Sequence, residues 1–284
     1  MGFFETDRVY FPSIPESLKN QFALKDLWLR PFGHAAEDRE VNFDRPLRLD
    51  VEVQILECCT RDSQGGKPDP SFFWNLEVGK RIECLLAIAT IDDREAFMIP
   101  IRCLNLACRE GLEIDFSMQE LSELQSSKPT KKSPEILVGN QTVRIRKPTG
   151  ADQLQWLEQA FKDEFSATQF MLKTLVLTED RSQLDSAAIA QGEWISAFNQ
   201  IMEEIDPLVN FQVQVQCPQC SVQKYYPIDF GAFALQRLRN YQHQLFDLVH
   251  RLASHYHWNE SEIFAIPAWR RQSYLARIDR EEHR

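Results

Sequence analysis

The chain has 284 residues, of which 43% are hydrophobic and 26% are charged, and its formal net charge is −10. This length can bury the core of one large domain or two smaller ones, and the composition is that of an ordinary soluble protein. The negative charge argues against a general affinity for nucleic acid, which depends on clustered Lys and Arg. No segment reads as an export signal or a bilayer span, so we expect a cytoplasmic protein without a membrane partner.

The first part of the chain is predicted to be rich in β-structure. Residues 47–56 alternate apolar and polar side chains almost without a break, which predicts a half-buried strand. Residues 82–91 and 97–103 are predicted to pair as strands that turn at residues 92–95. A short helix is expected over residues 117–124. We therefore place a β-rich N-terminal domain at residues 1–124.

One pattern occurs twice in this sequence, at a constant offset of 114 positions, as from Phe97 to Phe211. The paired residues are Phe97 and Phe211, Ile99 and Val213, Ile101 and Val215, Cys103 and Cys217, Ile114 and Ile228, Asp115 and Asp229, and Phe116 and Phe230. Each copy combines an alternating strand, a cysteine, a turn and a second strand. The repeat predicts two equivalent β-hairpins, at residues 97–116 and 211–230.

The repeated hairpins carry cysteines at metal-ligand spacing. Two residues separate Cys217 from Cys220 and four separate Cys103 from Cys108, so each pair of thiolates can reach one tetrahedral ion. If the hairpins meet, the four cysteines form a closed, zinc-ribbon-like site for a structural zinc ion. The alternative is that they are reduced cysteines packed as small hydrophobes. A thioredoxin-like redox site is disfavoured, because no helix is expected directly after Cys220.

A linker and a mainly helical domain are predicted to follow. Residues 125–136 read as the linker, because the stretch from Gln125 to Pro134 has two prolines and no apolar residue. The domain then spans residues 137–284. Its expected elements are a strand over 141–146, a helix capped by Thr149 or Asp152, helices over 166–177 and 187–205, the second hairpin, a helix of about six or seven turns after Phe230, and helices that begin at Asn259 and Pro267.

These elements together predict an α+β fold with a β-rich N-terminal half, a mainly helical C-terminal half and two cysteine-bearing hairpins. Asp115 and Asp229 occupy equivalent strand ends, where we expect each to cap the helix that follows its hairpin. The sequence contains no nucleophile elbow, glycine-rich phosphate loop or His-Glu metal helix, so no enzyme class is indicated.

Several segments of the second half are recognisable as a set. They are Arg146-Lys147-Pro148-Thr149-Gly150-Ala151-Asp152-Gln153, Ile205-Asp206-Pro207, Cys217-Pro218-Gln219-Cys220, Ile228-Asp229-Phe230, Tyr256-His257-Trp258-Asn259-Glu260-Ser261-Glu262-Ile263 and Arg270-Arg271-Gln272-Ser273-Tyr274-Leu275. This set resembles the T-even phage family of baseplate hub assembly chaperones, relatives of which also occur with phage-like contractile injection systems. Two positions differ from the family pattern: Ser221 and His257 stand where the family usually has glycine.

The resemblance implies a non-enzymatic assembly factor or baseplate-associated component of a contractile phage tail or phage-like injection system. Such a protein would chaperone hub or tape-measure subunits, with hub, spike or tape-measure proteins as its partners. Trp258, Trp269 and Tyr274 are the candidate contacts, since amphipathic aromatics supply large contact areas. Alternatively, these aromatics close the C-terminal helices onto the core. The alternative function is a zinc-containing protein- or nucleic-acid-binding regulatory module, and nucleic-acid binding would need a basic face.

Overall fold

The computed structural model describes residues 9–24, 26–91, 96–126, 134–138, 141–183 and 193–282. Helices and small antiparallel sheets alternate along this part of the chain, which confirms the α+β class. The helices are α1 (Glu16–Gln21), η2 (Ala36–Glu40), α2 (Arg48–Cys59), α3 (Pro70–Asn75), α4 (Val78–Ala89), α5 (Met118–Ser126), α6 (Gly150–Glu158), α7 (Glu164–Leu175), η3 (Thr178–Gln183), α9 (Glu193–Ile205), α10 (Phe230–Tyr256), α11 (Glu260–Ala265) and α12 (Ala268–Glu282).

The strands form four separate antiparallel sheets within the described residues. They are β1 (Val9–Tyr10), β2 (Leu27–Leu29), β3 (Thr60–Asp62), β4 (Phe97–Arg102), β5 (Gly111–Phe116), β6 (Glu135–Val138), β7 (Gln141–Arg144), β8 (Phe211–Gln216) and β9 (Gln223–Ile228). The first three make one sheet in the order β1-β2-β3, and the rest pair as β4-β5, β6-β7 and β8-β9. Both predicted hairpins are therefore present.

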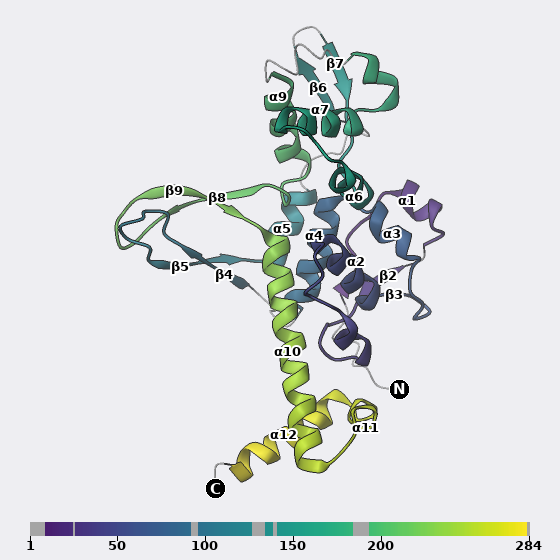
Figure 1. Ribbon diagram of the computed structural model, residues 1–284, viewed down its shortest axis with the longest axis vertical. Helices are drawn as coiled ribbons and strands as arrows, with labels where there is room; N and C mark the ends of the chain where they lie inside the picture. The colour runs from purple at the N-terminus through teal and green to yellow at the C-terminus, as the bar shows by residue number, and fades with distance from the viewer. Residues whose placement is uncertain are drawn as a thin grey trace.

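The molecule is a central helical block with three projections (Figure 1). One projection is an arm made of the β4-β5 and β8-β9 hairpins, which extend side by side. A second is a lobe that contains β6, β7, α7 and α9. The third is the long helix α10, which runs from the base of the arm to α11 and α12. None of the described helices combines the length and the apolar character that crossing a membrane requires.

The main core joins the two halves of the sequence. It is centred on α2 and α4, and it includes fully buried residues of α3 such as Phe72 and Phe73. Ile228 from the second hairpin and Phe230 and Leu238 from α10 belong to the same buried cluster. Because residues from both predicted domains share this core, the central block is assembled from distant parts of the chain.

Two predicted strands of the N-terminal half are wrong. Residues 48–59 form α2, and residues 78–89 form α4, so β4 pairs with β5 and not with residues 82–91. Both helices are buried on nearly all sides, and α2 lacks the clear polar face that gives a helix its period of 3.6 residues. Their β-branched residues then imitate a strand pattern, and the N-terminal half contains more helix than predicted.

Most elements of the second half match their predictions. Thr149 caps α6 with a capping box to Asp152, and Asn259 caps α11 in the same way with Glu262. Among the predicted linker residues, 127–133 lie outside the described residues, while α5 continues to Ser126 and β6 begins at Glu135. The predicted turn at 92–95 and the predicted helix start at 187–192 also lie outside them.

Candidate metal centre

The two repeated hairpins are anchored to the block by equivalent aromatic residues. Phe116 of β5 lies 5.8 Å from Phe211 of β8 and 5.1 Å from Phe230, measured between ring centroids. Phe211 is also 5.1 Å from Phe230, and Phe97 stacks on Phe233 of α10 at 5.4 Å. This cluster fixes the base of the arm, so both hairpins leave the core together and their turns reach the same tip.

Each hairpin ends in a turn that begins at a cysteine. The backbone N–H of Cys103 donates to the Glu110 carbonyl at 2.8 Å, and that of Cys217 donates to the Val222 carbonyl at 3.0 Å. The second turn is therefore two residues shorter than the first. Across the hairpins, the Leu104 N–H donates to the Tyr226 hydroxyl at 3.2 Å. These bonds hold the two turns against each other.

The four predicted cysteines meet at the tip of the arm. Their Sγ atoms all lie within 4.8 Å of one another, close enough to hold one metal ion. Two cross-hairpin pairs are closest: Cys103 to Cys220 at 3.7 Å and Cys108 to Cys217 at 3.8 Å. Thiolates about 2.3 Å from a tetrahedral zinc ion would lie about 3.8 Å apart. The observed pairs match this value, which confirms that the sequence repeat identified the right four residues as a metal-compatible set.

Two of the four thiols, Cys220 and Cys108, have pKa values that are shifted in opposite directions by their surroundings. The pKa of Cys220 is lowered to about 7, above all by the backbone N–H of Val222, although burial opposes this shift. The backbone N–H of Glu110 acts to lower the pKa of Cys108, but burial and the neighbouring thiols raise it to about 12. Because zinc is bound by thiolates, metal binding at these cysteines would release protons and depend on pH.

Both turns force a residue other than glycine into the left-handed region. Arg109, directly after Cys108, has φ of 54°, and Ser221, directly after Cys220, has φ of 59°. The Ser221 N–H donates to the Cys217 carbonyl at 2.8 Å in this conformation. A side chain at such a φ is strained by about 1–2 kcal/mol relative to glycine. The two turns therefore have backbone strain at the same place, directly after the second cysteine of each hairpin.

We expect Ser221→Gly to stabilise the protein. Glycine removes the left-handed strain but is more flexible in the unfolded chain, so the net gain is about 0.5–1 kcal/mol. A higher thermal midpoint, measured at saturating metal, checks this result. Ser221→Ala serves as the control, because it removes the hydroxyl and keeps the strain. An equal rise in both variants would show that backbone strain is not the cause.

Two of the three candidate partner residues pack against each other. The Trp258 ring stacks on Tyr256 at 4.6 Å and meets Tyr274 edge-on at 5.0 Å. These residues surround a small core of Leu248, Leu252, Ile263 and Ile278, which joins α10 to α11 and α12. Trp258 and Tyr274 thus take part in closing the C-terminal helices, which is the alternative that the sequence left open.

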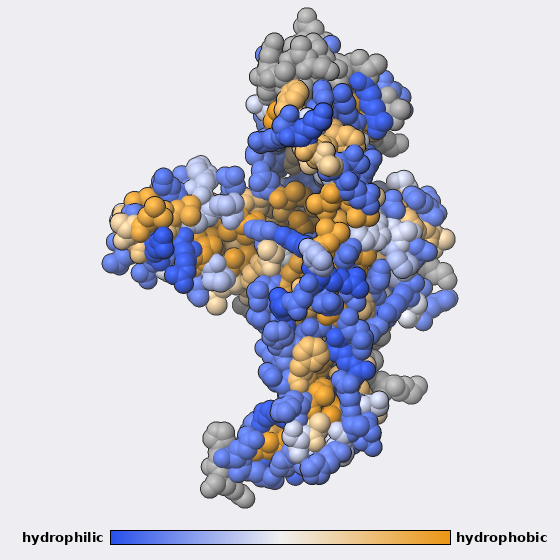
Figure 2. All heavy atoms as spheres, in the orientation of Figure 1, coloured by the Kyte–Doolittle hydropathy of each residue, from blue (hydrophilic) through white to orange (hydrophobic). Residues whose placement is uncertain are grey.

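The third candidate, Trp269, is exposed. Its exposed fraction is 64%, the largest of any aromatic residue among the exposed hydrophobics of the described chain. The hairpin arm carries further exposed apolar residues along its length, namely Met98, Leu104, Leu106 and Tyr225. Figure 2 shows hydrophobic atoms gathered at the end of this arm. The two surfaces lie on different projections, so one partner contact need not exclude another.

The two aspartates at the hairpin ends have different roles. Asp229 caps α10 as predicted, because its carboxylate accepts from the Ala232 N–H at 2.8 Å. Asp115 does not cap α5, where the Ser117 hydroxyl accepts from the Glu120 N–H instead. Asp229 also binds Arg48 of α2 through two hydrogen bonds, a link that sequence reasoning missed. The two residues are distant in the chain, and each alone resembles an ordinary surface charge.

No protein-family model, curated protein or solved structure matches this chain.

Proposed function

We propose that this protein is an assembly factor of a contractile phage tail or related injection system, and that its hairpin arm is held together by one structural zinc ion. The zinc proposal rests on the cluster of four Sγ atoms, of which each hairpin contributes two. Four thiolates fill every position of a tetrahedral ion. A closed site of this kind is structural, since a catalytic zinc keeps one position open for water.

The arm needs such a ligand for its own stability. A two-stranded hairpin is at best marginally stable alone, and the tip buries few apolar groups. Its buried residues are Cys103, Leu112 and Cys217. One ion bonded to both turns holds the hairpins together where packing is thin, in the same way that metal stabilises small domains elsewhere.

The motif set of the C-terminal half supports the assembly role. The family pattern has glycine at the two positions held here by Ser221 and His257, and both residues adopt positive φ, at 59° and 58°. Glycine is the residue that takes such a conformation most easily. Positive φ at these two positions is compatible with the glycines of the family pattern, although the side chains differ.

The exposed apolar surfaces support a role in holding other subunits. Trp269 is on α12, and the exposed apolar residues of the arm include Leu106, which is 80% exposed. Amphipathic aromatics and isolated apolar patches are typical of contact sites. Hub, spike or tape-measure subunits are the partners that the resemblance indicates. Of the three aromatic candidates, Trp269 is the one whose ring is free to bury against a partner.

A pull-down tests this assembly role. The tagged chain, expressed together with the genes adjacent to its own, should retain hub, spike or tape-measure subunits, identified by mass spectrometry. Trp269→Ala should reduce this recovery at least tenfold without lowering the thermal midpoint, because the ring is mostly exposed. Phe246→Ala is a matched control, since Phe246 is a 44% exposed aromatic on α10.

Other outcomes would decide against the assembly role. Recovery of nucleic acid or of regulatory proteins, with no tail component, would favour the alternative zinc-containing binding module. Equal losses of partner from Trp269→Ala and Phe246→Ala would show that α12 is not the specific contact.

A further inference from the structure

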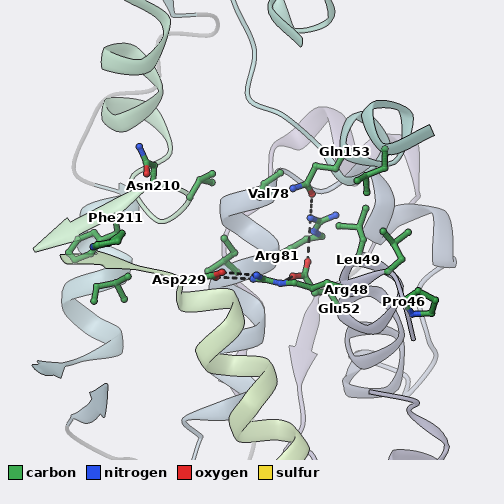
Figure 3. Close-up of a pocket in the computed structure, with 16 residues that line it drawn as sticks. Pro46, Arg48, Leu49, Glu52, Val78, Arg81, Gln153, Asn210, Phe211 and Asp229 are labelled. Atoms are coloured by element: carbon green, nitrogen blue, oxygen red, sulfur yellow. Dashed lines mark hydrogen bonds and ion pairs between the residues drawn. The ribbon is translucent and has the colours of Figure 1, made fainter. Parts of the chain in front are cut away.

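A cavity of about 590 Å³ lies where the central block, α6 and the base of the second hairpin meet (Figure 3). This volume is in the range of small-ligand sites. The walls are mainly apolar and include Leu47, Leu49, Val78, Leu157 and Val209. Leu157 and Val209 are 61% and 42% exposed, so apolar side chains also form the rim. The cavity is separate from the metal centre.

The charged residues of the cavity are unequally paired. Arg48 donates to both carboxylate oxygens of Asp229, at 2.7 and 2.9 Å, and to Glu52 at 2.8 Å. Its charge is therefore well matched by two carboxylates. Arg81 is paired more weakly: its Nη2 lies 3.5 Å from a carboxylate oxygen of Glu52, an ion pair without a hydrogen bond. Its one hydrogen bond runs from Nη2 to the side-chain oxygen of Gln153, and Figure 3 shows Arg81 between these two residues.

Arg81 is a buried cation with unused donors. Its exposed fraction is 1%, and Nε and Nη1 have no hydrogen-bond partner among the described residues. Burial lowers the pKa of this arginine, and the attraction of Glu52 only partly opposes the shift. Burying a guanidinium with most of its donors unpaired is destabilising, and an apolar residue of similar size would often be neutral or better.

We infer that this cavity binds a carboxylate attached to an apolar body, with Arg81 as the residue that receives the carboxylate. A carboxylate that displaces the Gln153 side chain reaches Nη2 together with Nε, which is a bidentate geometry that guanidinium favours, whereas Nη1 lies against Gly150. The apolar walls then cover the rest of the ligand. Arg48 does not compete for it, because Asp229 and Glu52 already occupy its donors.

Comparing two compounds that differ in the carboxylate group tests its role directly. The probe is 4-phenylbutyrate, a carboxylate on an apolar chain, and its control is 4-phenylbutanamide, which has the same shape without the charge. Binding to the full-length protein is measured by calorimetry, with ligand-observed NMR for weak affinities. The carboxylate should bind at least tenfold more tightly than the amide. Equal affinities, or no binding of either compound, would overturn the proposal.

Variants of the cavity sharpen the test. Arg81→Met should lose at least tenfold in affinity for 4-phenylbutyrate while its thermal midpoint stays the same or rises. Arg271→Met is the matched control, because Arg271 is also buried and its Nε and Nη1 are also unpaired, but it lies on α12 outside the cavity. Its affinity should stay within twofold of wild type. Retained binding in Arg81→Met would refute the assignment.

A variant that is expected to raise the affinity tests the proposal even if Arg81→Met does not fold. Gln153→Ala removes the one hydrogen bond on Nη2 of Arg81 and leaves its ion pair with Glu52, so affinity for the carboxylate should increase. A decrease would show that Gln153 takes part in binding and contradict the displacement step.

The source of the ligand is tested with acetyl-Phe-Leu carrying a free or an amidated C-terminus. Tighter binding of the free peptide than of 4-phenylbutyrate indicates a polypeptide end, and the reverse indicates a small free acid.

Discussion

Replacing Cys217 and Cys220 together with Ser should remove one zinc ion per chain and lower the thermal midpoint by about 10 °C. The reason is mass action, since an ion that binds only the folded state stabilises it by about 4 kcal/mol at a thousandfold excess over Kd. For a chain of this size, that energy corresponds to the stated shift. Elemental analysis of the purified protein and thermal unfolding with and without a chelator measure both effects.

The core cysteines provide a matched control for this prediction. Cys58 is buried in α2, away from the four clustered thiols, and burial raises its pKa to about 11. Cys58→Ala should therefore keep a full complement of metal even if packing changes slightly. Wild-type protein without metal, or a double Ser variant as stable as wild type in the presence of zinc, would contradict the structural site. Iron in place of zinc would keep the site and change its metal.

The cluster of four cysteines was predictable from sequence because cysteine is chemically specific and the pattern occurs twice. The repeat identified both hairpins even though their registers differ: Phe97 pairs with Phe116, whereas Phe211 pairs with Ile228. This shift of two residues keeps every side chain on its original face, because strand side chains alternate with a period of two. A repeat can therefore predict which residues face the core without predicting the exact pairing.

The central helices and the cavity were not predictable in the same way. In α2, Glu52 occupies a buried position, so polarity does not mark the solvent side of the helix. Its partners are Arg48 in the same helix and Arg81 in α4, and only tertiary structure brings the second one near. The alternation over residues 47–56 then reflects chance spacing within a largely buried helix, where the tertiary environment overrides the local pattern.

Asp38→Ala should destabilise the protein by about 3–5 kcal/mol. Asp38 is fully buried and accepts from Arg30 at 2.6 and 3.0 Å. It also accepts from the backbone N–H groups of Gly33, His34 and Ala35 at 2.9 to 3.1 Å. Burial alone would lower the pKa of Arg30, but the hydrogen bonds to Asp38 help to raise it above its usual value. Removing the carboxylate therefore leaves a mostly buried charge without its main partner, and thermal or denaturant unfolding measures the loss.

The same loop supports the C-terminal helices, so the loss should extend to them. Gln242 of α10 donates to the Asp38 carbonyl at 2.8 Å, and Arg271 of α12 donates to the His34 carbonyl at 2.9 Å. We expect Asp38→Ala to loosen α12 and to reduce partner recovery through Trp269 as a secondary effect. Asp44→Ala is the control, since the Asp44 carboxylate forms an exposed ion pair with Arg239, and such pairs contribute little. If both variants lose equal stability, the loop around Asp38 does not hold α12 in place.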